Sequence, residues 1–157
     1  MAQSVELYVY DISMGLGGPM ITSLTGIQTE AVYHSSVVFS NLEFFFGGGM
    51  PGNTGIAGIS WAEPGCSQFG TPIKKLTIGF TEVPLELFLE FLRESSDCWQ
   101  PNDYDLIRKN CNHFSQDAIA FLTGQDIPKH IVDQGMTLIS TPIGQMLEPM
   151  LKQFIPM

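Results

Sequence analysis

Apolar and polar positions alternate in the N-terminal third of the chain. Residues 5–12, VELYVYDI, alternate and are rich in β-branched and aromatic side chains, which predicts a β-strand. Strands are also predicted over 32–39, VYHSSVVF, and over 43–46, EFFF. Ser40 and Asn41 form a short connection between these two strands, so the pair is expected to be a β-hairpin. The first strand should end at a group of chain breakers: Gly15, Gly17, Gly18 and Pro19.

Apolar residues recur with helical spacing later in the chain. A short strand is expected over 74–80, KKLTIGF, and the segment VPLELFLEFLRES then predicts a helix with Pro84 near its first position. The apolar stripe of this helix, which should face a core, is Leu85, Phe88, Leu89 and Leu92. Its outward residues are Glu86, Glu90, Arg93 and Glu94. Packing alone explains this helix.

A further helix is predicted within residues 108–124, RKNCNHFSQDAIAFLTG. Asn110 suits an N-cap and Gly124 suits the C-terminal stop. Its inward stripe is Phe114, Ala118, Phe121 and Leu122. Cys111, three residues before Phe114, falls on the same face. We therefore expect its thiol to point inward at a helix start, where backbone N–H groups are unpaired.

The C-terminal segment predicts one more helix, beginning at Thr141 and Pro142. Its apolar stripe is Ile143, Met146, Leu147, Met150, Leu151 and Phe154. Pro149 lacks an N–H and should kink or end the helix. A helix packed on the core is favoured over an exposed partner-binding helix, although methionine-rich stripes make adaptable surfaces. The chain is expected to divide into a catalytic domain, 1–134, and a helical extension, 135–157, packed on that domain or placed at a partner interface.

Glycine and proline dominate the connection from Gly47 to Pro72, which begins GGGMPGNTG. No Gly-Lys-Ser/Thr follows, so this is not a phosphate-binding loop. A flexible loop that contains short strands is favoured over the wall of a substrate groove. No internal repeat is visible.

The composition indicates one globular domain. The chain has 157 residues, of which 44% are hydrophobic and 15% charged. Seven Lys and Arg stand against sixteen Asp and Glu, a formal charge of -9, and the basic residues are scattered. Nucleic acids and anionic membranes are therefore not expected as partners. The N-terminus lacks a signal-peptide pattern and no window has 18 uninterrupted apolar residues, so we expect an intracellular protein without a membrane span.

Three cysteines, Cys66, Cys98 and Cys111, lie far apart in the sequence. An odd number in a reducing compartment argues for free thiols. No CxxC pair occurs, so we expect neither a structural zinc nor any other cofactor. Cys66 and Cys98 are interpreted as ordinary thiols.

Cys111 could be a nucleophile if its thiol ionises. A helix start and a nearby imidazolium both lower a cysteine pKa. His113 lies two residues on and points to another side of the helix, and His130 is expected in a solvated loop beside Pro128. His34, on a predicted strand, could reach the helix start. Taken alone, each member of the pair is also compatible with a structural role, a buried cysteine or a core histidine.

The order of several motifs resembles a known family. ELYVYDIS comes first, YHSSVVF with EFFFGGG next, and NCNHFS running into FLTG and IP last. This is similar to the PPPDE domain, the permuted papain-like thiol peptidases that include the desumoylating isopeptidases, and the similarity covers nearly the whole chain. The resemblance implies an α+β fold in which an antiparallel sheet or small barrel packs against helices. Because the family is permuted, its histidine precedes its cysteine, as His34 precedes Cys111.

The resemblance implies that Cys111 is the nucleophile and His34 the base, as a dyad. The thiolate would attack a carbonyl and form an acyl-enzyme that water releases. The Cys111 N–H could hold the oxyanion, whereas a second donor cannot be identified from the sequence. The implied substrate is an isopeptide bond between a lysine and the Gly-Gly tail of a ubiquitin-like modifier, SUMO first among them, and the glycine-rich loop could line a narrow channel for it.

Two other functions stay open. A protein S-acyl thioesterase would use the same thiolate, with an apolar trough formed by Phe44, Phe45 and Phe46 or by the methionine-rich C-terminus. A non-catalytic adaptor would bind ubiquitin-like or shuttle proteins. The resemblance also implies a homodimer and a location in cytoplasm and nucleus.

Overall fold

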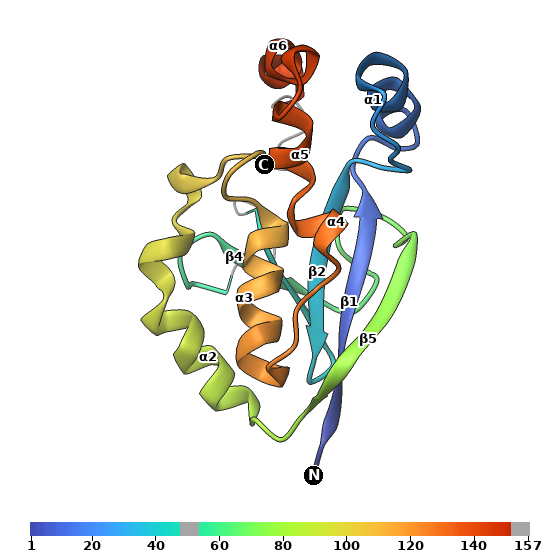
Figure 1. The fold of residues 1–157 in the computed structure, drawn as a ribbon. Coiled ribbons are helices and arrows are strands. Elements are labelled where there is room, and N and C mark those ends of the chain that lie inside the picture. Colours follow the sequence, from blue (N-terminus) through green and yellow to red (C-terminus); the bar gives the residue numbers. More distant parts are fainter. Residues whose placement is uncertain (48–53, 152–157) are drawn as a thin grey trace.

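The sheet is antiparallel and places its strands in the order β4-β3-β2-β1-β5. The computed structural model describes residues 1–47 and 54–151 (Figure 1). Within that part of the chain the strands are β1 (Gln3–Asp11), β2 (Tyr33–Phe39), β3 (Leu42–Phe46), β4 (Ile59–Ala62) and β5 (Lys74–Thr81). All four strands expected from the sequence are confirmed, and β4 is a short strand within the glycine-rich connection. Most of the GGGMPGNTG segment, and the expected channel there, lie outside the described residues.

The hairpin between β2 and β3 follows from two residues. Ser40 and Asn41 have φ angles of 56° and 61°, the left-handed conformation that a tight hairpin turn requires at both central positions. Val37 pairs with Phe44 and Phe39 with Leu42 across the turn. The predicted hairpin is therefore confirmed.

Two helices cover one face of the sheet (Figure 1). α2 (Leu85–Glu94) and α3 (Cys111–Thr123) begin and end near the predicted positions. Their apolar stripes meet the sheet in a core that includes Val5, Leu7, Val9, Val37, Phe44, Phe46, Phe88, Leu92, Phe114, Ala118 and Leu122. Phe121 departs from its predicted inward position. It is 36% exposed and stacks on Phe91 with ring centroids 4.1 Å apart, at the edge between the two helices.

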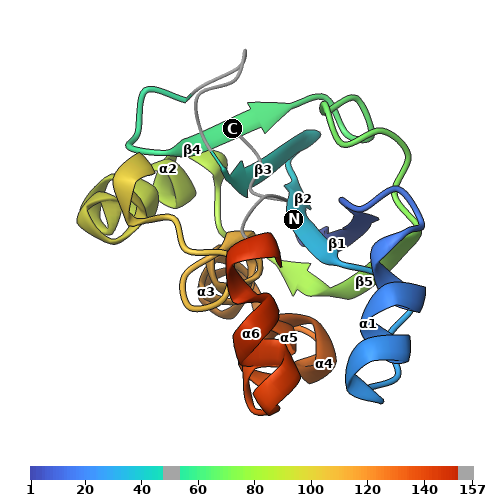
Figure 2. The ribbon, with the colours of Figure 1, turned by 90° about the horizontal axis from the view of Figure 1, so that it is seen from above.

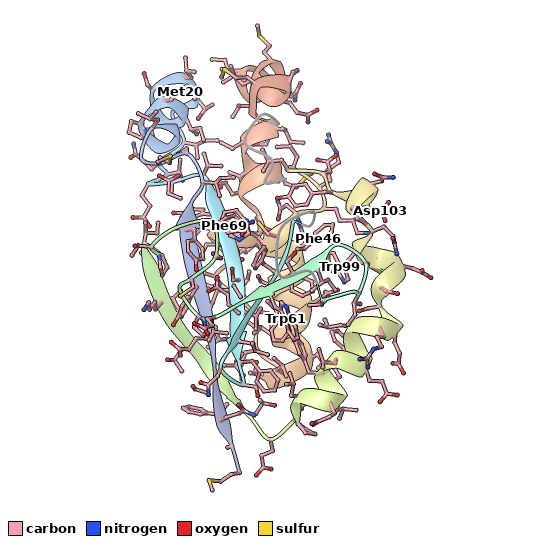
Figure 3. The ribbon with its side chains drawn as sticks, turned by 180° about the vertical axis from the view of Figure 1, so that it is seen from behind. Met20, Phe46, Trp61, Phe69, Trp99 and Asp103 are labelled. Atoms are coloured by element: carbon pink, nitrogen blue, oxygen red, sulfur yellow. The ribbon has the colours of Figure 1, made fainter. Side chains whose placement is uncertain are left out.

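The opposite face of the sheet is covered by the connection from β4 to β5. Figure 2 shows the sheet curling, and this connection joins its two edge strands. Phe69 from the connection packs with Tyr8, Tyr10 and Val38, a second small cluster. Figure 3 shows Phe69 over β2, on the side of the sheet turned away from α3. Both faces of β2 are therefore buried, and every residue of that strand is buried.

β1 ends at Asp11, before the predicted chain breakers, and two of these glycines begin a helix that the sequence did not predict, α1 (Gly17–Thr25). A Cβ atom at Gly18 would lie 2.6 Å from the backbone carbonyl of Glu30, so glycine is needed there for close approach of two segments. The helix was not predicted because a glycine that allows close packing and one that ends an element look alike in a sequence.

Three helices follow α3 towards the C-terminus: α4 (Lys129–Val132), α5 (Gln134–Ile139) and α6 (Pro142–Leu151). The start of α6 is as predicted, and the helix continues past Pro149 to Leu151. Of the two expected effects of Pro149, the end of the helix is wrong and the kink stays a prediction. In α6, Ile143 is 44% exposed and Met146 is 80% exposed, whereas Leu147 packs against a small cluster that contains Leu138. The preference for a core-packed stripe is therefore wrong for Ile143 and Met146, and Phe154 lies outside the described residues.

α1 and α6 stand at the same end of the molecule (Figure 1). The cluster under them consists of Ile21, Val32, Leu106 and Leu138. The proposed division at residues 134 and 135 stays a prediction. Among the helices of residues 1–47 and 54–151, none has the length and apolar character needed to cross a membrane.

Candidate active site

The start of α3 is fixed by a reciprocal cap. The Asn110 side chain accepts hydrogen bonds from the backbone N–H groups of Asn112, at 2.8 Å, and His113, at 3.4 Å. Nδ1 of His113 accepts from the N–H of Asn110 at 3.1 Å. This is a capping box with histidine at its third position. The predicted N-cap is confirmed, and His113 is used to hold the helix start.

Asn112 joins the helix start to β2. Its Nδ2 donates to the carbonyl of Tyr33 at 3.0 Å, and its Oδ1 accepts from the hydroxyl of Ser35 at 2.7 Å. The hydroxyls of Ser35 and Ser115 lie 2.9 Å apart. These polar groups are buried and satisfy one another, so they fix the first turn of α3 against the strand that carries His34.

The Cys111 thiol is buried, with 1% of the residue exposed. The hydroxyl of Tyr104 lies 3.8 Å from Sγ, and the thiol lies 3.9 Å from Oδ1 of Asn112. Burial raises the pKa of Cys111 to about 11, although Tyr104 and the N–H groups of Ser35, Asn112 and Cys111 oppose the rise. Desolvation therefore outweighs the helix start, and the thiol is neutral near pH 7.

His34 is fully buried and lies on the face of β2 opposite Ser35. Its ring lies on Phe69, with centroids 3.7 Å apart, and it contacts Tyr10 and Phe45 at 5.7 Å each. Among the described residues neither ring nitrogen has a hydrogen-bond partner. Burial lowers the pKa of His34 to about 3. Ser35 faces α3, so the His34 side chain projects from β2 on the side turned away from Cys111. No thiol–imidazole hydrogen bond is formed in this arrangement, and both groups are neutral.

The third histidine, His130, lies elsewhere. It is exposed on α4 rather than in a loop, and the edge of its ring contacts Tyr33 at 5.6 Å. The structure thus brings the strand of His34 and the helix of Cys111 together, and it leaves His113 and His130 in other roles.

Several residues around the site gave no signal in the sequence. Glu43 is buried and accepts hydrogen bonds from the Tyr10 hydroxyl at 2.6 Å and from the N–H of Gly65 at 2.9 Å, which ties the β4–β5 connection to the sheet. Tyr104 contacts Cys111, and Phe69 contacts His34. No local sequence pattern indicates either contact.

The side chains of Phe44, Phe45 and Phe46 do not form a trough. All three are almost completely buried, and Phe44 and Phe46 belong to the core under α2 and α3. This overturns the phenylalanine trough as support for an S-acyl thioesterase, whereas the alternative trough at the methionine-rich C-terminus stays a prediction.

A partly enclosed hollow near the site has a volume of about 110 Å³ and is lined by residues that include Thr29, Tyr33, His130 and Gln134. Pockets that hold cofactors or drug-sized ligands are typically about 300 to 1,000 Å³, so this enclosed hollow is too small for one. A wider depression of about 380 Å³, open to the surface, is lined by Gln28, Thr29, Glu30, Tyr33 and Lys74. In residues 1–47 and 54–151, no three His, Cys, Asp or Glu side chains gather as a metal site would require.

The fold and the site define a class. An antiparallel sheet packed on a helix that starts at a cysteine, with a histidine on the neighbouring strand, is the arrangement of a papain-like thiol peptidase. Residues 3–152 match the PPPDE putative peptidase domain, and the chain belongs to that family.

The chain is similar to curated members of several organisms. It is 40% identical over 148 residues to desumoylating isopeptidase 1 of Homo sapiens, covering 94% of this chain and 83% of the human protein. It is 40% identical to the protein of that name from Rattus norvegicus and 37% identical to the one from Xenopus laevis, with the same coverage.

Proposed function

We propose that this chain is a cysteine isopeptidase that removes a ubiquitin-like modifier, SUMO first among them, from lysines of other proteins. The observation that carries the proposal is the 40% identity, over 94% of the chain, to relatives named desumoylating isopeptidase 1. The buried cysteine at the start of α3 supports it, because that position offers both a nucleophile and a backbone donor.

The proposed reaction uses Cys111 and His34 as a dyad. When the site opens, a His34 nitrogen takes the thiol proton and the thiolate attacks the isopeptide carbonyl. A C–S bond forms and the carbonyl π electrons move to oxygen. Collapse of this intermediate breaks the C–N bond, and His34 returns the proton to the leaving lysine amine. Water then cleaves the thioester and regenerates the thiol.

The backbone of Cys111 is the first oxyanion donor in this proposal. The Asn110 side chain accepts from the N–H groups of Asn112 and His113, and the N–H of Cys111 is not used by that cap. The side-chain amides of Asn110 and Asn112 each use one of their two N–H donors within the protein, which fixes their orientation. Asn110 Nδ2 donates to the Leu106 carbonyl at 2.6 Å, and Asn112 Nδ2 donates to Tyr33.

Opening of the site is part of the mechanism. A buried neutral thiol is a poor nucleophile, and a histidine with a pKa of about 3 is a poor base at neutral pH. Exposure moves both pKa values towards their ordinary range. The proton can pass between the two groups once the backbone at His34 turns the imidazole towards Cys111. A closed resting state also shields Cys111 from oxidation, which acts on exposed thiolates.

A homodimer is part of the proposal. Large apolar side chains are exposed at the end formed by α1 and α6, including Met14 at 90%, Leu16 at 76% and Met146 at 80%. Apolar groups gathered on one end of a molecule are a common sign of an interface. Light scattering during gel filtration tests this point, and a monomer at all concentrations would contradict it.

Electrophilic probes test the function. SUMO and ubiquitin carrying a C-terminal electrophile are each incubated with the native chain, with Cys111→Ser and with His34→Ala, beside a fluorogenic acyl thioester. We expect SUMO labelling that is abolished by Cys111→Ser and reduced at least about a hundredfold by His34→Ala. Turnover of the thioester without any labelling would establish a thioesterase instead. If none of the three reagents reacts and the folded chain still binds SUMO, the protein is an adaptor.

A further inference from the structure

A tyrosine hydroxyl lies beside the proposed nucleophile. Oη of Tyr104 is 3.8 Å from Sγ of Cys111, and the side chain is partly buried between the segment before α3 and β3. The thiol is otherwise surrounded by backbone N–H groups and by Oδ1 of Asn112. Tyr104 is thus a side-chain donor that already faces the reacting atom.

The position of this hydroxyl is fixed by the fold. The Tyr104 ring packs on Phe46 of β3 with centroids 5.1 Å apart, and Phe46 is fully buried. Between Tyr104 and the helix cap, Asp105 and Lys109 exchange two backbone hydrogen bonds of 2.9 Å. This short closed turn connects the tyrosine to the first turn of α3, so the hydroxyl cannot drift far from Cys111.

The chemical state of the hydroxyl suits a donor. Burial, together with the neighbouring thiol, strongly raises the pKa of Tyr104, so its oxygen keeps its proton throughout the physiological range. A neutral phenol donates a hydrogen bond, and it does so most strongly to a charged acceptor. In the resting site the acceptor is sulfur. After nucleophilic attack the negative charge lies on the carbonyl oxygen, which is attached to the carbon that sulfur has bonded.

We propose that Tyr104 is a catalytic residue, the second oxyanion donor, which acts together with the backbone N–H of Cys111. The hydroxyl donates a hydrogen bond to the developing oxyanion and keeps its proton, while His34 carries the proton that moves. The proposal rests on the function proposed above, since it needs Cys111 to attack a carbonyl. It explains why the side-chain amides of Asn110 and Asn112 can be committed to holding the helix start.

The substitution Tyr104→Phe tests this role because it keeps the ring on Phe46 and removes only the hydroxyl. Loss of one oxyanion donor typically lowers kcat by about 10²- to 10³-fold. We expect a decrease of that size for cleavage of a SUMO isopeptide substrate, with KM changed by no more than about twofold, because the interaction is made in the transition state. Ser4→Ala, which removes an exposed hydroxyl at the start of β1, where Ser4 pairs with Phe80, is the control and should leave kcat unchanged.

Two probes separate an oxyanion donor from a structural residue. A SUMO C-terminal aldehyde forms a hemithioacetal whose oxygen occupies the oxyanion position, whereas a SUMO propargylamide forms a vinyl thioether without an oxyanion. Tyr104→Phe should weaken aldehyde inhibition by about 10²-fold and change propargylamide labelling by less than about threefold. An equal loss of reactivity towards both probes would overturn the proposal. It would show that Tyr104 affects only the Cys111 thiol and not the oxyanion.

The outcomes also separate this inference from the proposed function. If the native chain reacts with neither probe, the isopeptidase function fails and the donor role fails with it. If the native chain reacts with both probes and the aldehyde inhibits Tyr104→Phe as strongly as the native chain, only the donor role is overturned. Thermal unfolding of Tyr104→Phe, expected within a few degrees of the native chain, shows that a loss of activity is not a loss of folding.

Discussion

The hydroxyl of Ser35 donates to Oδ1 of Asn112 at 2.7 Å, and each residue follows a member of the proposed dyad in the sequence. This buried hydrogen bond couples β2 to the first turn of α3. The relative position of the His34 and Cys111 backbones is therefore set by their neighbours, not by a contact between the two side chains. Because His34 projects from the face of β2 opposite the one that contacts α3, contact between the two side chains requires the backbone of β2 at His34 to change as well as the β4–β5 connection to move.

Removing the Ser35 hydroxyl should destabilise the protein. Ser35→Ala leaves Oδ1 of Asn112 buried without its donor, which typically costs about 1 to 3 kcal/mol. Ser36→Ala is the matched control, because the neighbouring Ser36 hydroxyl is buried and has no partner among the described residues. Urea unfolding measures both. A loss for Ser36→Ala as large as that for Ser35→Ala would contradict the importance of the Ser35–Asn112 bond.

The buried His34 should make stability depend on pH. Its pKa is about 3 in the folded protein and about 6.5 when unfolded, so below pH 6.5 the unfolded chain binds a proton that the folded chain does not. The contribution of His34 is fully present above pH 6.5 and decreases as the pH falls towards 3. We expect a loss of about 2 kcal/mol in the free energy of unfolding at pH 5 relative to pH 8.

Histidine variants show which residue causes this pH dependence of stability. His113 contributes in the same direction, since burial lowers its pKa as well. His34→Gln should remove most of the difference between pH 8 and pH 5. His130→Gln, at an exposed position on α4, should leave it unchanged. An unchanged difference in His34→Gln would show that the imidazole is solvated in solution.

The Cys111 thiol should resist alkylation in the absence of substrate. With a pKa of about 11, only about one thiol in a thousand is ionised at pH 8, and the sulfur is also shielded. Cys66 and Cys98 are exposed and should react with iodoacetamide first, at least about a hundredfold faster. Peptide mass spectrometry over a time course measures the three rates. Modification of Cys111 as fast as Cys98 would show that the closed site is not the resting state.

The elements that the sequence predicted well are those with a repeating apolar pattern. The strand with Val5, Leu7 and Val9 and the helix with Phe88 and Leu92 bury these side chains at the expected spacing. α4 and α5 were missed because four or six residues are too few to show a helical period. α1 was missed because its first glycines are required by a neighbouring segment that no local pattern reveals.

The candidate site also has some features that the sequence predicts and others that it does not. The positions of Cys111 and His34 on a helix start and a strand could be predicted, because caps and alternation are local signals. Their burial could not, because it depends on Phe69, a residue 35 positions from His34 in sequence, and on contacts between α3 and β2 about 80 positions apart. The balance between the helix start and desolvation, which decides the pKa of Cys111, is likewise a property of the assembled core.

Phe69 should control access to His34. Its ring lies 3.7 Å from the His34 ring, and the connection that carries it is held by the hydrogen bond from the Gly65 N–H to the buried Glu43. Phe69→Ala removes the stacked ring, so water can reach the imidazole and the pKa of His34 should rise towards its ordinary value. NMR titration of the imidazole protons measures that rise.

Labelling of Cys111 by the SUMO propargylamide should also become faster in Phe69→Ala, because less of the binding energy is needed to open the site. Phe80→Ala, which truncates a phenylalanine that is 65% exposed on β5, is the matched control and should change neither the titration nor the labelling rate. If Phe69→Ala leaves the pKa of His34 near 3, another part of the fold keeps the imidazole dry and Phe69 is only a packing residue.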